Sequence, residues 1–151
     1  MHRVPGTGAN HDDAHITLCD TYGVDGSISV KFMIGEHVVT GWDIFRTENG
    51  FNNTRLTDDL GYFAFWYKGD PSVTTIYVWL YWSGSQDSKA IDVFSVPAEG
   101  GYVYIALSQW SKTATQILNF GVAYNHSNTT FKATIYLDNF MFIDLPDTLN
   151  S

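Results

Sequence analysis

The stretch 74–82 constrains the fold more than any other part of the chain, because its side chains alternate in character with a period of two. The even-numbered positions hold Ile76, Val78, Leu80 and Trp82. The odd-numbered positions hold Tyr77, Trp79 and Tyr81. Successive side chains of a β-strand point to opposite faces of the sheet, so only one row can face a core. The aliphatic row suits a buried interior, and the aromatic row is therefore predicted to lie on an outer face.

Other segments also have the composition of strands and are separated by turn residues. They are 27–34, 62–68, 102–107, 117–124 and 133–143. The turn sequence Gly69-Asp70-Pro71-Ser72 follows 62–68, which predicts a hairpin with the strand 74–82. A single helical turn is predicted within 108–115. This pattern predicts an all-β fold, an antiparallel two-sheet β-sandwich.

The length of 151 residues suits one domain with one core. Residues 16–145 are predicted to form the module, and 1–15 and 146–151 read as linker segments rich in Gly, Pro, Asn and Asp. No apolar run approaches the roughly 20 residues of a membrane-spanning helix, which argues against a membrane partner. The chain as given shows no secretory signal. We expect it to be a piece of a longer, secreted protein whose signal lies outside this stretch.

Charge excludes further classes of function. The chain has 8 basic and 16 acidic residues, a formal net charge of -8, so a nucleic-acid partner is not expected. The single cysteine, Cys19, cannot form an internal disulfide, and no Cys/His cluster has the spacing of a zinc site. Aromatic residues make up 16% of the chain and charged residues also only 16%, well below the ~25% charged residues typical of globular domains. Aromatic residues therefore make up as large a share of this chain as charged residues do.

Catalytic signatures are missing from the sequence. Glycoside hydrolysis usually needs two carboxylates held about 5 to 10 Å apart, and the three glutamates, Glu36, Glu48 and Glu99, form no repeated acidic motif on one strand. The acidic pairs at 12–13 and 58–59 lie in turn-like segments. No nucleophile motif and no phosphate-binding loop occurs. We therefore predict that the chain is not an enzyme.

The aromatic row suggests a ligand. Three rings at alternate positions span about 13 Å, comparable with a few sugar rings laid end to end. Rings stack on the apolar C–H faces of sugars, and phenol and indole groups hydrogen-bond their hydroxyls, so a carbohydrate fits. Tyr102 and Tyr104 are predicted to join this face if their strand shares the sheet. The opposing interpretation is that a loop or the second sheet covers the rings, since aromatic residues dominate sandwich cores as well.

Several runs together resemble jelly-roll carbohydrate-binding modules similar to families eleven, thirty and forty-four. These runs are Phe63-Ala64-Phe65-Trp66-Tyr67-Lys68-Gly69-Asp70, Gly101 to Trp110, Ile117 to Val122 and Thr134 to Phe142. The resemblance covers roughly residues 60 to 143. It implies a jelly roll like that of galactose-binding domains, and a non-catalytic module that targets an attached glycoside hydrolase to plant polysaccharide. The implied ligand is a β-glucan chain (cellulose-like, mixed-linkage glucan or xyloglucan), bound along a concave sheet. We expect the module to be a monomer.

The resemblance also implies a structural calcium ion with Asp138, in the closing Tyr-Leu-Asp-Asn motif, as one ligand. Calcium takes six to eight oxygen ligands, so Asp138 would need partners. The sequence offers Asp12, Asp13, Asp20 and Glu36 near the first strand. The alternative is a carboxylate that backbone N–H groups satisfy at a strand end.

Further contacts to a sugar are proposed from residue type alone. Arg46, Arg55 and Lys68 could donate to vicinal hydroxyls, and Lys68 has the same parity as Trp66. Trp42 is an additional candidate for stacking, whereas Trp110 is more consistent with a core position. The alternative function is a structural or protein-interaction domain whose exposed aromatic residues dock onto a neighbouring domain.

Overall fold

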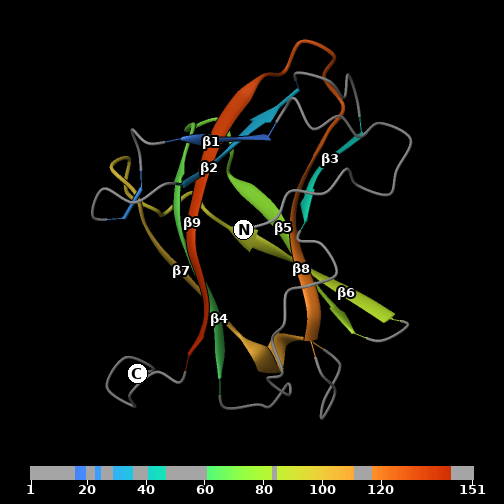
Figure 1. The fold of residues 1–151 in the computed structure, drawn as a ribbon. Coiled ribbons are helices and arrows are strands. Elements are labelled where there is room, and N and C mark those ends of the chain that lie inside the picture. The colour runs from blue at the N-terminus through green and yellow to red at the C-terminus, as the bar shows by residue number, and fades with distance from the viewer. Residues whose placement is uncertain are drawn as a thin grey trace.

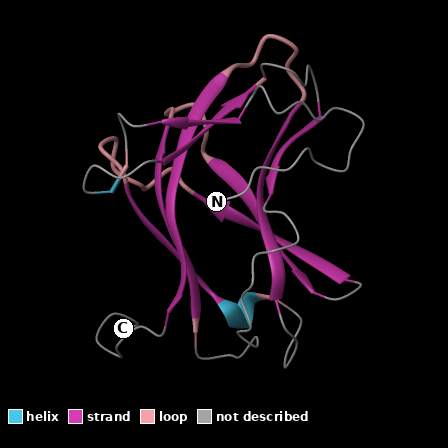
Figure 2. Ribbon diagram, in the orientation of Figure 1, coloured by secondary structure: helices cyan, strands magenta, loops and turns pink. Residues whose placement is uncertain are grey.

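The computed structural model describes residues 16–19, 23–24, 29–35, 41–46, 61–82, 85–110 and 117–143. At 16–19, 41–46, 81–82, 85–86, 117–119 and 126 the description is limited to the backbone. Within these ranges the regular structure consists of nine strands, the short 3-10 turn Leu107–Gln109 and a further 3-10 residue at Val24 (Figure 2). The predicted all-β class is confirmed. The single helical turn covers Leu107–Gln109, at the start of the segment predicted for it.

The strands form two antiparallel sheets that appear as two layers in Figure 1. The five-stranded sheet has the order β1 (Ile16–Cys19), β2 (Ser29–Ile34), β9 (Ala133–Ile143), β4 (Tyr62–Gly69), β7 (Gly101–Ala106). The four-stranded sheet has the order β3 (Gly41–Arg46), β8 (Ile117–His126), β5 (Thr75–Trp82), β6 (Ser85–Asp92). Every strand pair is antiparallel. Consecutive strands often lie in different sheets, as a jelly roll requires.

The predicted hairpin of 62–68 with 74–82 is wrong. β4 pairs with β7 and β9, whereas β5 pairs with β6 and β8, so the turn after β4 crosses from one sheet to the other. The Asp70 carboxylate accepts bonds from the Ser72 N–H and hydroxyl, and Val73 N–H donates to the Asp70 carbonyl. Val73 then packs into the core. The same residue types form turns between paired strands and turns that connect two sheets. The composition of the turn therefore could not distinguish a hairpin from a connection between sheets.

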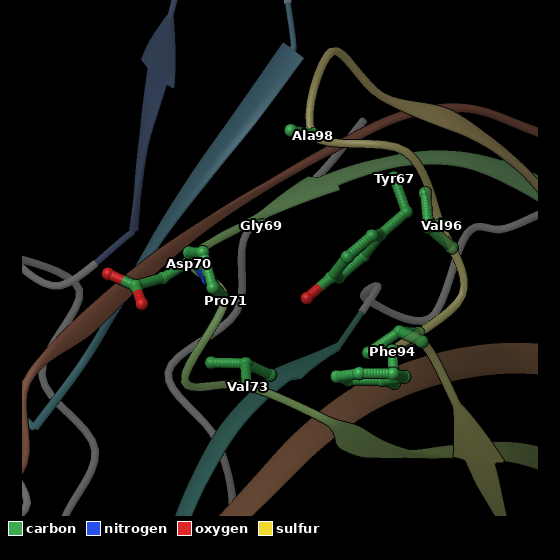
Figure 3. Close-up of a pocket in the computed structure, with 9 residues that line it drawn as sticks. Tyr67, Gly69, Asp70, Pro71, Val73, Phe94, Val96 and Ala98 are labelled. Carbon is green, nitrogen blue, oxygen red and sulfur yellow. The ribbon is translucent and has the colours of Figure 1, made fainter.

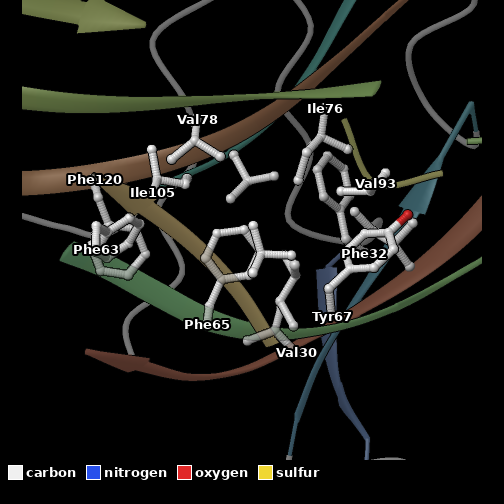
Figure 4. Packing of buried hydrophobic residues seen from close by; sticks show 14 of the residues in the cluster. Val30, Phe32, Phe63, Phe65, Tyr67, Ile76, Val78, Val93, Ile105 and Phe120 are labelled. Atoms are coloured by element: carbon white, nitrogen blue, oxygen red, sulfur yellow. The ribbon is translucent and has the colours of Figure 1, made fainter. Parts of the chain in front are cut away.

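The core lies between the sheets and is filled by the inward rows of the central strands (Figure 4). Aromatic rings dominate one end of it. The Phe63 ring lies 5.0 Å from that of Phe120 and 5.0 Å from that of Phe142, measured between centroids. Trp110 is also buried, which confirms its predicted core position. Burial of such rings is the main stabilising contribution in a sandwich of this size.

Because of a β-bulge in β9, odd-numbered residues before the bulge and even-numbered residues after it face the same core. The β4–β9 register shifts between Ala64 and Trp66, and on β9 Asn139 has a positive φ of 53°. Leu137 is buried before the irregularity, and Phe140 and Phe142 pack against the core after it. An uninterrupted alternation would have turned these two rings outward. The bulge therefore keeps the whole length of β9 apolar on its inner side.

Replacing Tyr67 by phenylalanine is expected to raise the stability of the fold. The side chain is buried, and its hydroxyl has no hydrogen-bond partner among the residues that the structure describes. An unsatisfied buried polar group costs about 1–3 kcal/mol, so removing it should raise the free energy of unfolding by about 1 kcal/mol. Urea unfolding of the two proteins measures the difference. A loss of stability in Tyr67→Phe would show that the hydroxyl has a partner after all.

Candidate functional site

The aromatic row of β5 lies on the outer face of the four-stranded sheet. Ile76, Val78 and Leu80 are each 0% exposed, whereas Tyr77 and Trp79 between them are partly exposed. The predicted parity is therefore confirmed at positions 76 to 80. For Tyr81 the described part is the backbone, which pairs with Asn119 on β8.

The residues of the neighbouring strand opposite these two rings are small. Trp79 is opposite Gly121 and Tyr77 is opposite Ala123 on β8. A Cβ atom added to Gly121 would lie only 2.2 Å from Cζ2 of the Trp79 indole, so the six-membered ring packs directly against this part of the main chain. Ala123 is 2% exposed although it lies on the outer parity of β8. The Trp79 indole therefore extends sideways over β8, and we call Tyr77 and Trp79 with Gly121 and Ala123 the platform.

Two further predicted site residues lie on β3, at the edge of the same sheet. Arg46 is opposite Gly121, so its backbone is in the same cross-strand row as Trp79. Trp42 is opposite Asn125, an exposed residue on the outer parity of β8. The register thus brings the backbones of both residues to the sheet that carries the platform. Arg55 lies outside the described residues.

Tyr102 and Tyr104 do not share this sheet, so the condition under which they were predicted to extend the aromatic row of β5 is not met. They lie on the outer face of β7, in the five-stranded sheet, on the opposite side of the sandwich. Trp66 of β4 is directly opposite Tyr102. The alternation within one strand reveals which residues face outward, but it contains no information about which of two sheets the strand joins.

These residues form a second aromatic face, which we define as Trp66, Tyr102 and Tyr104. The two tyrosine rings stack with centroids 6.0 Å apart and an angle of 29° between their planes. Tyr104 is 47% exposed. Asn139 Nδ2 donates to Tyr102 Oη over 2.7 Å. Beside this face, the Lys68 ammonium donates to the Ala98 carbonyl over 2.7 Å, so Lys68 also lies away from the platform.

Glycine permits the placement of Trp66. Gly100 has a φ of +105°, and a Cβ atom there would lie 2.2 Å from Cζ2 of the indole. Only glycine adopts this backbone conformation readily while leaving room for the ring. The second aromatic face is therefore held by the loop before β7 as well as by the sheet.

Asp138, the predicted calcium ligand, accepts two backbone hydrogen bonds. Its Oδ2 accepts from Val24 N–H over 2.9 Å and its Oδ1 from Asn139 N–H over 2.7 Å. The described residues contain no group of three or more His, Cys, Asp or Glu side chains able to hold a metal ion. The other expected ligands, Asp12, Asp13, Asp20 and Glu36, lie outside the described residues. The described part of the chain therefore supplies Asp138 alone, and calcium stays a prediction.

No helix in the described residues has the length and apolar character needed to cross a bilayer. No protein-family model and no curated protein matches the sequence.

Solved structures do match the fold. A crystal structure of a family 30 carbohydrate-binding module is 13% identical, with a TM-score of 0.62 over 86% of this chain and 83% of that chain. The family 30 module of a cellulosomal cellulase of Clostridium thermocellum is 13% identical, with a TM-score of 0.58 over 94% and 90%. An agarase is 13% identical with a TM-score of 0.57, and 95% of this chain covers 26% of that longer chain. The chain therefore has the jelly-roll β-sandwich fold found in carbohydrate-binding modules such as those of family 30.

Proposed function

We propose that the chain is a non-catalytic module that binds a β-glucan chain, cellulose-like, mixed-linkage or xyloglucan, on the platform of its four-stranded sheet. The observation that carries the proposal is the packing of the Trp79 indole against Gly121, beside Tyr77 and above a fully buried aliphatic row. This arrangement places the indole over the outer surface of the sheet, where the C–H faces of successive sugars could stack on the aromatic rings. Arg46 and Trp42, placed on the same sheet by register, are proposed to contribute further contacts, as is Tyr81.

The fold supports the general part of this proposal. Carbohydrate-binding modules of family 30 share it, and the agarase contains a matching region within a chain about four times as long. We therefore propose that the module belongs to a larger, secreted enzyme and brings its catalytic domain to polysaccharide. No reaction is assigned to the module itself.

Affinity gel electrophoresis tests the function directly. Native gels that contain mixed-linkage β-glucan, xyloglucan or hydroxyethylcellulose are compared with a gel that contains no polysaccharide. We expect at least one β-glucan to retard the protein relative to an inert reference protein. Equal mobility in all gels would contradict the proposal.

The second aromatic face favours one other function, docking onto a neighbouring domain of the same polypeptide. Tyr104 is one of two large hydrophobic side chains that are exposed in the described part of the chain. Exposed aromatic patches also mark protein interfaces. In the agarase a region of this fold is part of a longer chain, so a domain of this kind can have a neighbouring domain to dock onto. An interface function predicts no retardation in any of the gels. It also predicts that the isolated module binds the adjacent domain and that Tyr104→Ala abolishes this binding.

Calcium is proposed as a structural ion with Asp138 among its ligands. If it binds, calcium added after EDTA treatment should raise the melting temperature of the wild type by about 5–10 °C at roughly 100 times its Kd. Asp138→Ala should abolish this difference, whereas Glu99→Ala, at an exposed acidic residue, should keep it. If Asp138 only accepts backbone hydrogen bonds, Asp138→Ala should still be less stable than the wild type. Calcium should then have no effect on the melting temperature of the wild type. A wild-type melting temperature that is independent of calcium would therefore rule out the ion.

A further inference from the structure

A cavity of about 170 Å³ lies at one end of the sandwich, away from the platform and between two loops (Figure 3). One loop is the turn after β4, which contributes Asp70, Pro71 and Val73, and the other is the 93–100 loop between β6 and β7. Tyr67, Val73 and Val93 form the buried part of the lining. A cavity of about 150 Å³ with apolar walls accommodates one benzene ring. The space therefore suits one six-membered ring.

The Tyr67 hydroxyl is a buried polar group in the wall of this cavity. The side chain is 2% exposed, and the hydroxyl has no hydrogen-bond partner among the described residues. Figure 3 shows the hydroxyl directed from the tyrosine ring toward the space between the Asp70–Val73 turn and Phe94. Burial raises the pKa of Tyr67 far above its ordinary value, and the Asp70 charge adds to this rise. The group therefore stays protonated and can donate a hydrogen bond to an occupant.

The rim adds an apolar surface, and a carboxylate is directed away from it on the other side of the turn (Figure 3). Phe94 is 75% exposed, which is unusual for so large an apolar side chain, and it lines the cavity. Asp70 is exposed, and its bonds from the Ser72 N–H and hydroxyl lower the pKa of its carboxyl. The Ser72 bonds occupy Oδ1 of Asp70. A negatively charged occupant is disfavoured beside this carboxylate, in a protein of net charge -8.

We infer that this cavity is a second carbohydrate site, which takes a single neutral pyranose ring such as the end of a glycan chain. The apolar walls and Phe94 would contact the C–H face of the sugar. Tyr67 would donate to a sugar oxygen. A space for one ring cannot take the interior of a chain, so this site would differ from the platform in its ligand. The choice of a sugar rests on the proposed function.

Titrations followed by ¹⁵N–¹H correlation spectra test the inference. The probes are methyl β-D-glucopyranoside and methyl β-D-galactopyranoside for the cavity, and cellohexaose for the platform. We expect at least one methyl glycoside to shift the amide signals of Asp70, Val73 and Phe94 in the wild type. The same shifts should persist in Trp79→Ala, because Trp79 does not line the cavity.

Two variants assign the binding to the cavity. Tyr67→Phe keeps the ring and should weaken methyl glycoside binding about five-fold, whereas Phe94→Ala should weaken it about ten-fold. Unshifted amides at 70, 73 and 94 with both methyl glycosides would overturn the inference, as would equal affinities in the wild type and both variants. Cellohexaose reports on the proposed function separately through the amides of Tyr77 and Trp79. The two proposals can therefore fail independently in one experiment.

Discussion

Replacing Trp79 by alanine is expected to weaken binding of the retarding β-glucan by about 30-fold or more. The indole forms the larger part of the platform and packs against Gly121 on the neighbouring strand. Truncation of a central aromatic contact typically costs 2 kcal/mol or more, which corresponds to about a 30-fold change in Kd. Isothermal titration calorimetry with the soluble polysaccharide measures the change.

Tyr104→Ala is the matched control for this variant. It also removes an aromatic side chain from an outer face, but from the opposite side of the sandwich. Binding by the platform predicts that Tyr104→Ala keeps the wild-type Kd. The reverse result, with affinity lost in Tyr104→Ala and kept in Trp79→Ala, would move the glycan site to the second aromatic face. Near-ultraviolet circular dichroism should show a folded protein in both cases.

Replacing Phe63 by alanine is expected to destabilise the protein by about 3–5 kcal/mol, the usual cost of truncating a fully buried phenylalanine. The ring is 0% exposed and contacts the rings of Phe65 and Phe120, as well as the two phenylalanines of β9. Phe63→Ala would leave a cavity in contact with both sheets. The melting temperature should fall by roughly 6–20 °C. Differential scanning calorimetry gives the value.

Phe94→Ala removes the same atoms from a side chain that is 75% exposed. Its free energy of unfolding should stay within about 0.5 kcal/mol of the wild type. A comparable loss of stability in the two variants would mean that the core does not lie between the sheets as described.

The sequence predicted those strands best whose two faces differ strongly in character. In β5 a fully apolar row alternates with partly exposed aromatic residues, so periodicity alone identified both the strand and its faces. β6 has the sequence Ser-Gln-Asp-Ser-Lys-Ala-Ile-Asp and was not predicted. It is the last strand of its sheet among the described residues, and charged residues such as Lys89 and Asp87 oppose edge-to-edge association. An edge strand of this kind carries little hydrophobic signal, and the short strands β1 and β3 were missed as well.

The candidate site was only partly predictable for a different reason. The outward orientation of Trp79, Tyr102 and Tyr104 follows from local alternation and was predicted correctly. Their division between two sheets depends on which strands pair, and pairing is decided by contacts between residues far apart in the chain. The cavity beside Tyr67 was missed because two loops, joined only by the fold, create it.

The contact between Trp79 and Gly121 also has an evolutionary consequence. Any side chain at 121 would occupy the volume now filled by the indole. Descendants and relatives of this chain should therefore replace the glycine only after the tryptophan has gone, and the two positions should covary. Under the proposed function, a homologue that has lost the glycine should also have changed its ligand or lost it.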